Sequence, residues 1–189
     1  MRVMKDIDIR QSLVEKLIHQ NEGHDYRIIQ ELAICDGVSR ADIAVANGSL
    51  CGYEIKSDAD TLERLPSQML YYNQTFDKVF IVVGTKYENR ILEYIPDWWG
   101  IYIASYDKHG DVILKQKKRG RVNKEISADA LLKLLWRAEL VELLKQHGVK
   151  SLSGKNRRIL RKMAAEKISL KDIRNFTREQ LKNRTEWRE

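Results

Sequence analysis

Long apolar stretches are missing from this sequence of 189 residues. No run of about 18 apolar residues occurs, so we expect no membrane-spanning helix and no membrane partner. Residues 1–6 lack the apolar core of a secretory signal, which favours a cytoplasmic protein. Cysteine is also scarce, and the two that occur, Cys35 and Cys51, lack the paired spacing of a zinc motif. We therefore expect both thiols to be free and buried.

Basic residues outnumber acidic residues in only one part of the sequence, although the whole chain carries a formal net charge of +7. Residues 1–116 hold 13 basic and 18 acidic side chains, a balance of −5, whereas residues 117–189 hold 21 and 9, a balance of +12. We predict a core over 1–116 and a basic helical extension over 117–189. Such an extension favours a polyanionic partner, here DNA, and the alternative is a solvated basic surface.

The most informative stretch of the sequence is a predicted β-hairpin around Asn47-Gly48, a dipeptide that is the strongest short hairpin signal. Apolar-rich runs at 40–46 and 50–57 flank it. Charged side chains in such strands are costly unless they have partners, so their presence indicates a purpose. The charged residues set into the two strands are Asp42, Glu54 and Lys56.

The length of the hairpin loop decides which of these side chains meet. Glu54 and Lys56 are two residues apart and therefore share one face of their strand. Asp42 joins them only if the loop has an odd number of residues. The chemistry therefore predicts an odd loop, Ala46-Asn47-Gly48 with Gly48 in the left-handed region, or a bulge.

Two converging carboxylates repel each other and call for a counter-ion. A small set of oxygen ligands suits magnesium or manganese, and a bound cation of this kind activates water and stabilises charge on a phosphoryl group. Asp42 and Glu54 are the expected metal ligands, and the backbone carbonyl of Ile55 is a candidate third ligand. Lys56 is placed to orient the attacking water or to stabilise developing negative charge.

The pattern Asp42-x11-Glu54-x-Lys56 resembles the PD-(D/E)XK nuclease superfamily. Wider runs at 40–44, 52–58 and 60–68 look like one bacterial family of that superfamily, the locus-named Sce family. The resemblance covers roughly residues 5–105 and, more loosely, the C-terminal helices. Ala41 stands where the superfamily usually has proline. The resemblance implies a restriction-endonuclease-like mixed sheet flanked by helices, and relatives in the superfamily often form homodimers.

Further site residues are implied by the same resemblance. The superfamily usually has an upstream glutamate; Glu31 is the candidate fourth metal ligand, with Glu15 and Glu22 as competitors and a solvent-facing strand residue as the alternative. Gln68 and Tyr72, four residues apart on one helix face, resemble a motif that positions the site and the DNA strand in recombination-type and Cas-associated nucleases. The alternative for this pair is ordinary helix packing.

Several arginines are candidates for contact with nucleic acid. Arg64 would join the stripe of Gln68 if the helix is continuous, and its positive charge could meet a phosphate. The basic stretch 115–121 is either a phosphate grip or a solvated linker, and the C-terminal helices are expected to expose a basic surface. The candidate contact residues are Arg64, Arg119, Arg121, Arg157, Arg158 and Arg161.

The remaining pattern predicts an α/β fold. Apolar residues recur at helical spacing over 6–20, the stretch 26–34 is typical of a strand, and the continuous apolar run at 78–84 is typical of a buried central strand. Other expected helices cover about 66–76, 86–95, 127–147, 155–166 and 170–183, and other expected strands cover 101–104 and 112–114.

Taken together, these features predict a divalent-metal-dependent DNA endonuclease or exonuclease-like phosphodiesterase, acting in repair or in defence by a phage or its host. The expected catalytic residues are Asp42, Glu54, Lys56, Gln68 and Tyr72. The alternative is a catalytically silent module of the same fold that binds nucleic acid or a protein partner. A steep fall of affinity with salt would separate nucleic-acid binding from protein binding.

Overall fold

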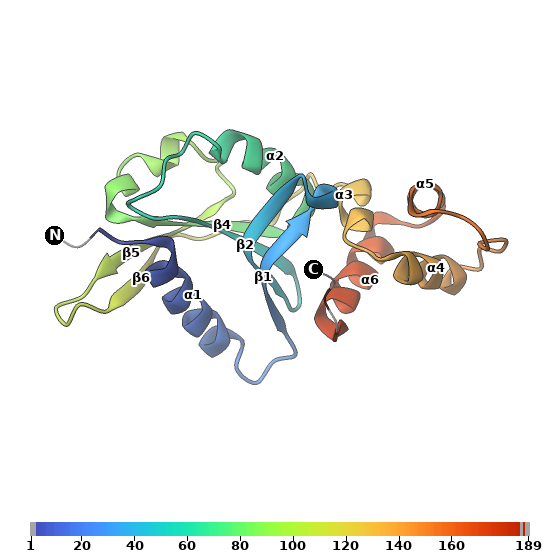
Figure 1. Ribbon diagram of the computed structural model, residues 1–189, viewed down its shortest axis with the longest axis horizontal. Helices are drawn as coiled ribbons and strands as arrows, with labels where there is room; N and C mark the ends of the chain where they lie inside the picture. Colours follow the sequence, from blue (N-terminus) through green and yellow to red (C-terminus); the bar gives the residue numbers. More distant parts are fainter. Residues whose placement is uncertain (1–2, 186, 188–189) are drawn as a thin grey trace.

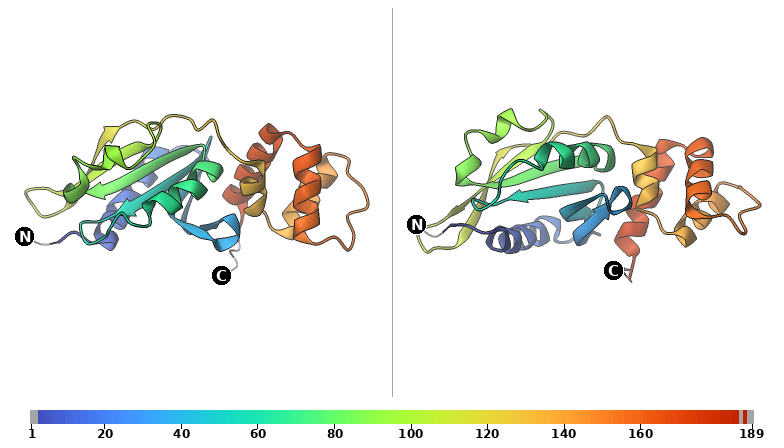
Figure 2. Two further views of the ribbon diagram at one scale, coloured as in Figure 1. Left: turned by 90° about the horizontal axis from the view of Figure 1, so that it is seen from above. Right: turned by 45° about the horizontal axis from the view of Figure 1, so that its top comes forward.

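A six-stranded mixed sheet occupies one end of the elongated protein, and a group of helices occupies the other (Figures 1 and 2). This computed structural model describes residues 3–185 and 187. The strands are β1 (Arg27–Ile34), β2 (Ser39–Ala46), β3 (Leu50–Lys56), β4 (Lys78–Gly84), β5 (Gly100–Tyr106) and β6 (Val112–Lys118). The helices are α1 (Asp6–Asn21), α2 (Leu65–Thr75), α3 (Ala128–Lys133), α4 (Arg137–Gln146), α5 (Arg157–Lys167) and α6 (Leu170–Asn183).

The strands lie in the sheet in the order of the sequence, β1 to β6. The pairs β1–β2, β2–β3 and β5–β6 are antiparallel, whereas β3–β4 and β4–β5 are parallel. The mixed α/β sheet flanked by helices that the sequence predicts is therefore present. Its two edges are β1 and β6, and β1 is the edge that lies toward the helical end (Figure 1).

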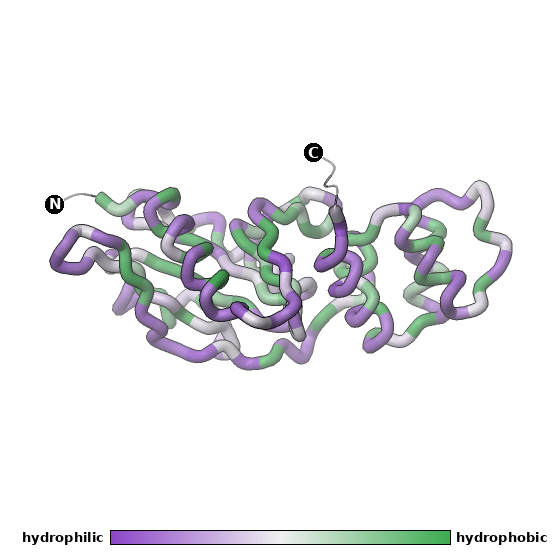
Figure 3. The backbone as a smooth tube through the Cα atoms, turned by 90° about the horizontal axis from the view of Figure 1, so that it is seen from below, coloured by the Kyte–Doolittle hydropathy of each residue, from purple (hydrophilic) through white to green (hydrophobic). Residues whose placement is uncertain are grey.

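Helices cover both faces of the sheet, because side chains that alternate along β2 and β3 are apolar in both directions. One face packs on α1, with Leu13 and Ile43 among its fully buried residues. The other face packs on α2, and its apolar core continues without a break into α3–α6, where Leu131 and Leu181 belong to the same cluster. Hydrophobic and hydrophilic residues alternate along these terminal helices, as expected for amphipathic segments (Figure 3).

Two of the expected helices differ from the structure. Two 3-10 turns, η2 (Thr85–Tyr87) and η3 (Ile91–Glu93), replace the helix expected at 86–95, and the Tyr87 hydroxyl donates to the carbonyl of Asp60 at 2.5 Å. The helix expected at 127–147 is divided into α3 and α4. The cause is Trp136, which has extended backbone angles and caps α4, with its N–H donating to Glu139 at 2.6 Å.

The boundary between the two predicted parts stays a prediction. The last strand, β6, runs two residues beyond the expected end of the core at residue 116, and one apolar cluster joins the sheet to the helices. Both cysteines are free and buried, as predicted. Within residues 3–185 and 187, no helix is long and apolar enough to span a membrane.

The hairpin loop has an odd number of residues, as predicted, but it lies one position further along the chain. Ala46 pairs with Leu50, so the loop consists of Asn47, Gly48 and Ser49. The Asn47 side-chain oxygen accepts the Ser49 N–H at 2.9 Å. This Asx-type turn closes the loop, and Gly48 is not in the left-handed region.

The close contact between β3 and α2 gives a stability prediction. A Cβ added at Gly52 would lie 2.5 Å from the ring of Phe76, which is fully buried. We expect Gly52→Ala to lower the free energy of unfolding by about 1–3 kcal/mol, the usual cost of overpacking, in urea denaturation. Gly48→Ala is the matched control, because nothing lies within 4 Å of its added Cβ. Equal denaturation midpoints for the two variants would contradict this packing.

Candidate functional site

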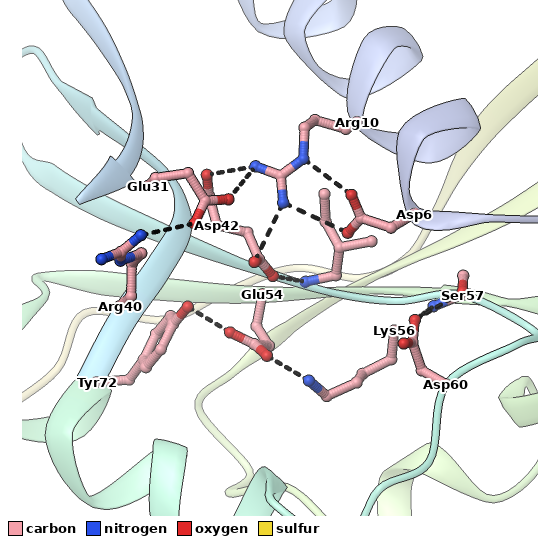
Figure 4. Close-up of polar contacts among 11 residues, drawn as sticks. Asp6, Arg10, Glu31, Arg40, Asp42, Glu54, Lys56, Ser57, Asp60 and Tyr72 are labelled. Atoms are coloured by element: carbon pink, nitrogen blue, oxygen red, sulfur yellow. Dashed lines mark hydrogen bonds and ion pairs between the residues drawn. The ribbon is translucent and has the colours of Figure 1, made fainter. Parts of the chain in front are cut away.

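The candidate site lies at the fork where β2 and β3 separate (Figure 4). Backbone pairing of the two strands ends at Ile43 and Tyr53. The same register, continued by one residue, brings Asp42 opposite Glu54. Beyond the last pair, the N–H of Ile55 donates to the Asp42 carboxylate (N to Oδ2, 2.7 Å). Asp42 thus satisfies a backbone group that would otherwise lack a strand partner.

The carboxylate of Glu54 is almost fully buried, with 1% of the residue exposed. One oxygen accepts a hydrogen bond from Lys56 (Nζ to Oε1, 2.5 Å), and the other accepts from the hydroxyl of Tyr72 on α2. Burial of a charge is costly unless it is paired and hydrogen-bonded. Lys56 and Tyr72 meet that requirement, so these three residues form a compact buried unit.

Arg10 of α1 ties several acidic residues to this fork. Its Nη2 lies 3.2 Å from Asp42 Oδ1, its Nη1 lies 2.9 Å from Glu31 Oε1, and its Nε donates to Asp6 at 2.9 Å. The continued β1–β2 register also places Glu31 opposite Asp42. Sequence reasoning missed Arg10 and Asp6; their four-residue spacing at a helix start was the available signal.

The charge state of Asp42 is set by its surroundings. Burial, followed by the charge of Glu54, raises the pKa of Asp42 to about 7, although the Ile55 N–H and Arg10 act in the opposite direction. Burial and the same two carboxylates also raise the pKa of the Tyr72 hydroxyl well above its ordinary value, so Tyr72 remains a donor.

The carboxylate oxygens at the fork are already engaged and cannot coordinate a cation without rearrangement. All four side-chain oxygens of Asp42 and Glu54 already accept contacts from Arg10, Ile55, Lys56 or Tyr72. Within the described part of the chain, no three His, Cys, Asp or Glu side chains gather as a metal-binding group. Magnesium or manganese at Asp42, Glu54, Ile55 and Glu31 stays a prediction that would require these contacts to rearrange.

Beside the fork lies a hollow of about 370 Å³. Asp42, Arg64 and Gln68 line it, and the buried Gln68 Oε1 has no hydrogen-bond partner within the described residues. A second hollow of about 860 Å³ follows the outer edge of β1 toward α3 and α4. The two share Glu31, Gly37 and Arg40, and we call them together the basic channel.

Cations dominate the lining of the basic channel. Among the described lining residues are three carboxylates: Glu31, Asp36 and Asp42. The same described lining holds seven cations: Arg27, Arg40, Arg64, Lys133, Arg137, Arg157 and Arg184. Sequence reasoning named Arg64 and Arg157 and missed the other five, because only the tertiary fold brings β1 beside α3 and α4.

The other predicted nucleic-acid contacts lie in different settings. Arg119 and Arg158 are exposed, and Arg121 donates to the carbonyl of Asp97 at 3.0 Å. Arg161 forms a two-pronged ion pair with Asp36 at 2.7 and 2.5 Å, which fastens α5 to the turn after β1. Contact of these residues with nucleic acid stays a prediction.

Helix α6 uses its basic residues to dock on the sheet. Arg174 pairs with Asp77, Arg178 donates to the carbonyl of Gly48 at 3.1 Å, and Lys182 lies 2.6 Å from Asp25. These three cations of α6 have partners within the protein and do not add to a freely exposed basic surface, and binding of DNA by the C-terminal helices stays a prediction. Four cations that line the basic channel are exposed: Arg40, Arg64, Arg137 and Arg157.

Comparison with known proteins gives two concordant matches. A family model described as Bacteriophage P4 protein cII matches residues 2–188. The protein is also 32% identical over 182 residues to "Protein cII" of Enterobacteria phage P4, which covers 96% of this chain and 68% of that protein. No solved structure matches at a significant level.

These matches overturn the assignment made from the hairpin motif. The PD-(D/E)XK superfamily and its Sce family are wrong as the family of this chain, since the match to the phage protein extends over nearly its whole length. The predicted metal-dependent nuclease function, and the prediction that the chain is a hydrolase, rested on that resemblance and are wrong with it. A short charged motif on a hairpin was given too much weight, because buried ion pairs can also be structural.

The raised pKa of Asp42 predicts how stability depends on pH. Its pKa of about 7 lies above the ordinary aspartate pKa of 3.8, so the folded state holds a proton that the unfolded chain releases. This contribution to stability is fully present below about pH 4 and is lost as the pH rises through 7. Asp42→Asn cannot titrate, so the parent should lose thermal stability relative to this variant between pH 5 and 8.

The control for this experiment is Asp97→Asn, which removes a carboxylate whose side chain is 96% exposed. Its melting temperature should follow the parent at every pH. Parallel curves for the parent and Asp42→Asn would show that Asp42 ionises normally and would contradict the arrangement described for the fork.

Proposed function

Because the chain belongs to the bacteriophage P4 protein cII family, we propose that it is a phage regulatory protein that binds DNA without cleaving it. The observation that carries this proposal is the basic channel, whose exposed lining cations are Arg40, Arg64, Arg137 and Arg157; of its other cations, Arg184 is buried against Glu139 and Lys133 pairs with Asp129. Cations that line one concave surface raise the local concentration of a polyanion and release its counter-ions on binding.

The environment of the individual cations supports a binding role. The side chain of Arg40 is 65% exposed and meets Glu31 only at 3.9 Å, and Arg64 is exposed at the mouth of the first hollow. Both guanidinium groups can therefore reach a phosphate with little loss of existing contacts. Arginine suits this task because its planar fork matches the phosphate oxygens.

The contacts at the fork favour DNA binding without hydrolysis. Lys56, which a hydrolytic role would need near water, is 5% exposed and is held by Glu54. We propose that the Asp42–Glu54–Lys56–Tyr72 cluster acts as a rigid, charge-balanced floor that holds α2 against β3. Its cost in desolvation is met by the paired contacts that it makes.

We also propose that the sheet has a restriction-endonuclease-like architecture. An antiparallel β1–β2–β3 unit followed by the parallel strands β4 and β5 supports a restriction-endonuclease-like sheet. Such an architecture concerns the fold alone, because one fold serves many functions. A homodimer, expected from the same resemblance, stays a prediction.

Charge-removing variants test the proposal. We expect fluorescence anisotropy to show binding of labelled DNA that weakens steeply as salt is raised. Arg40→Ala and Arg64→Ala should each weaken binding and lower the slope of log K against log salt by about 0.7–1, the loss of one phosphate contact. The measurement is a salt titration of each variant with the same oligonucleotide.

The matched control is Lys108→Ala, which removes an exposed cation from the turn between β5 and β6, away from the basic channel. Its affinity and salt slope should equal those of the parent. Absence of DNA binding at low salt would refute the proposed function, and an equal loss in Lys108→Ala would show that binding is not confined to the channel.

A further inference from the structure

We infer that the basic channel takes a single strand of nucleic acid and stacks its bases on the indole rings at the helical end, Trp136 first among them. This inference rests on the proposed function and specifies the form of its ligand. It depends on the concave shape of the site, the position of the aromatic residues and the geometry of the edge strand.

The concave shape of the channel favours a single strand over a duplex. Duplex DNA is usually read by an element that protrudes into a groove, such as a helix or a two-stranded ribbon. Here the cations line hollows of about 370 and 860 Å³, the size range of sites that enclose small ligands. A single strand with splayed bases fits such a hollow, whereas a duplex would span its rim.

Cations lie beside aromatic rings in the larger hollow. Trp136 and Trp187 both line the larger hollow. The guanidinium of Arg184 lies 4.1 Å from the ring centre of Trp136 and 4.8 Å from that of Trp187. Arg184 is itself fixed by Glu139, with Nη2 2.7 Å from Oε2. Arg184 therefore covers one face of each ring and holds it in place, so a base would stack on the opposite face, as bases do on rings beside a basic groove.

The edge strand favours a nucleic acid over an added peptide strand. A partner strand on β1 would need a regular row of backbone groups. Glu31, in the middle of β1, has φ of 55°, and the turn that follows holds Cys35 and Asp36 at φ of 52° and 59°. This kink interrupts the edge where a peptide would have to pair. The row of cations beside it suits a phosphate backbone instead.

The path through the channel follows from these contacts. Arg40 is shared by the two hollows, so it lies where a strand would pass from one to the other. Arg64 and the unpartnered Gln68 Oε1 lie at one end, and Arg137 and Trp136 lie at the other. A short strand can therefore meet phosphate-binding cations along its length and stack at the helical end.

Binding of matched ligands tests the inference. The probes are a labelled oligothymidylate of about 12 nucleotides, a duplex of the same length and a polyglutamate peptide of similar charge. At equal salt, the oligothymidylate should bind at least about tenfold more tightly than the other two and should quench tryptophan fluorescence. Equal or tighter binding of the duplex, or of polyglutamate, would overturn the inference and point to recognition of charge alone or of an acidic peptide.

Variants of the ring locate the stacking. Trp136→Leu should weaken oligothymidylate binding by about tenfold, the usual loss for one stacked base, whereas Trp136→Phe should restore most of the affinity. Trp98→Leu, at the half-buried indole before β5, is the control and should bind like the parent. Circular dichroism verifies the folding of each variant. Equal binding by Trp136→Leu and Trp136→Phe would remove Trp136 from the site.

The two hypotheses fail in different ways. If no nucleic acid binds in any form, the proposed function is wrong. If the duplex binds with the salt dependence expected for channel cations and Trp136→Leu has no effect, DNA binding stands and the single-strand inference is wrong.

Discussion

Burial of the Glu54 carboxylate is the constraint on which the arrangement of the site depends. Within the described part of the chain, Lys56 and Tyr72 are the hydrogen-bond partners of its oxygens, and an unpaired charge at that depth would be severely destabilising. Because the buried carboxylate needs the Tyr72 hydroxyl as a partner, Tyr72 points into the protein, and this contact fixes α2 across the sheet. One turn earlier on the same helix, Gln68 then lies at the hollow beside the fork. The buried contact thus positions the surface that we assign to nucleic acid.

Ion pairs made by α1 balance further negative charge on the opposite side of the fork. Arg10 of α1 reaches Asp42, Glu31 and Asp6, so helices on both faces of the sheet contribute to one cluster. Negative charge is balanced inside the protein, while cations remain accessible along the adjoining channel. This separation explains how a chain whose first 116 residues have a balance of −5 can still present a basic surface beside β1.

The sequence predicted the parts that depend on local pattern. The hairpin, the odd loop and the shared face of Glu54 and Lys56 follow from side-chain alternation and turn chemistry. It could not show that Arg10 crosses to Asp42, because that contact is tertiary, and the break at Trp136 was missed although Glu139, three residues later, is a local capping signal. The family was misassigned for a related reason: Asp42, Glu54 and Lys56 have the spacing of a nuclease motif, yet spacing does not reveal whether those groups face a substrate or each other.

Hydrogen–deuterium exchange with and without oligothymidylate tests the central claim most directly, because it reports where a strand lies. Amides on the free edge of β1, within residues 27–33, and those at 136–137 line the larger hollow and should exchange more slowly when the oligonucleotide is bound. Amides of the turn between β5 and β6 should be unaffected. Protection confined to the outer sides of α5 and α6, with no change along β1, would contradict the basic channel as the binding site.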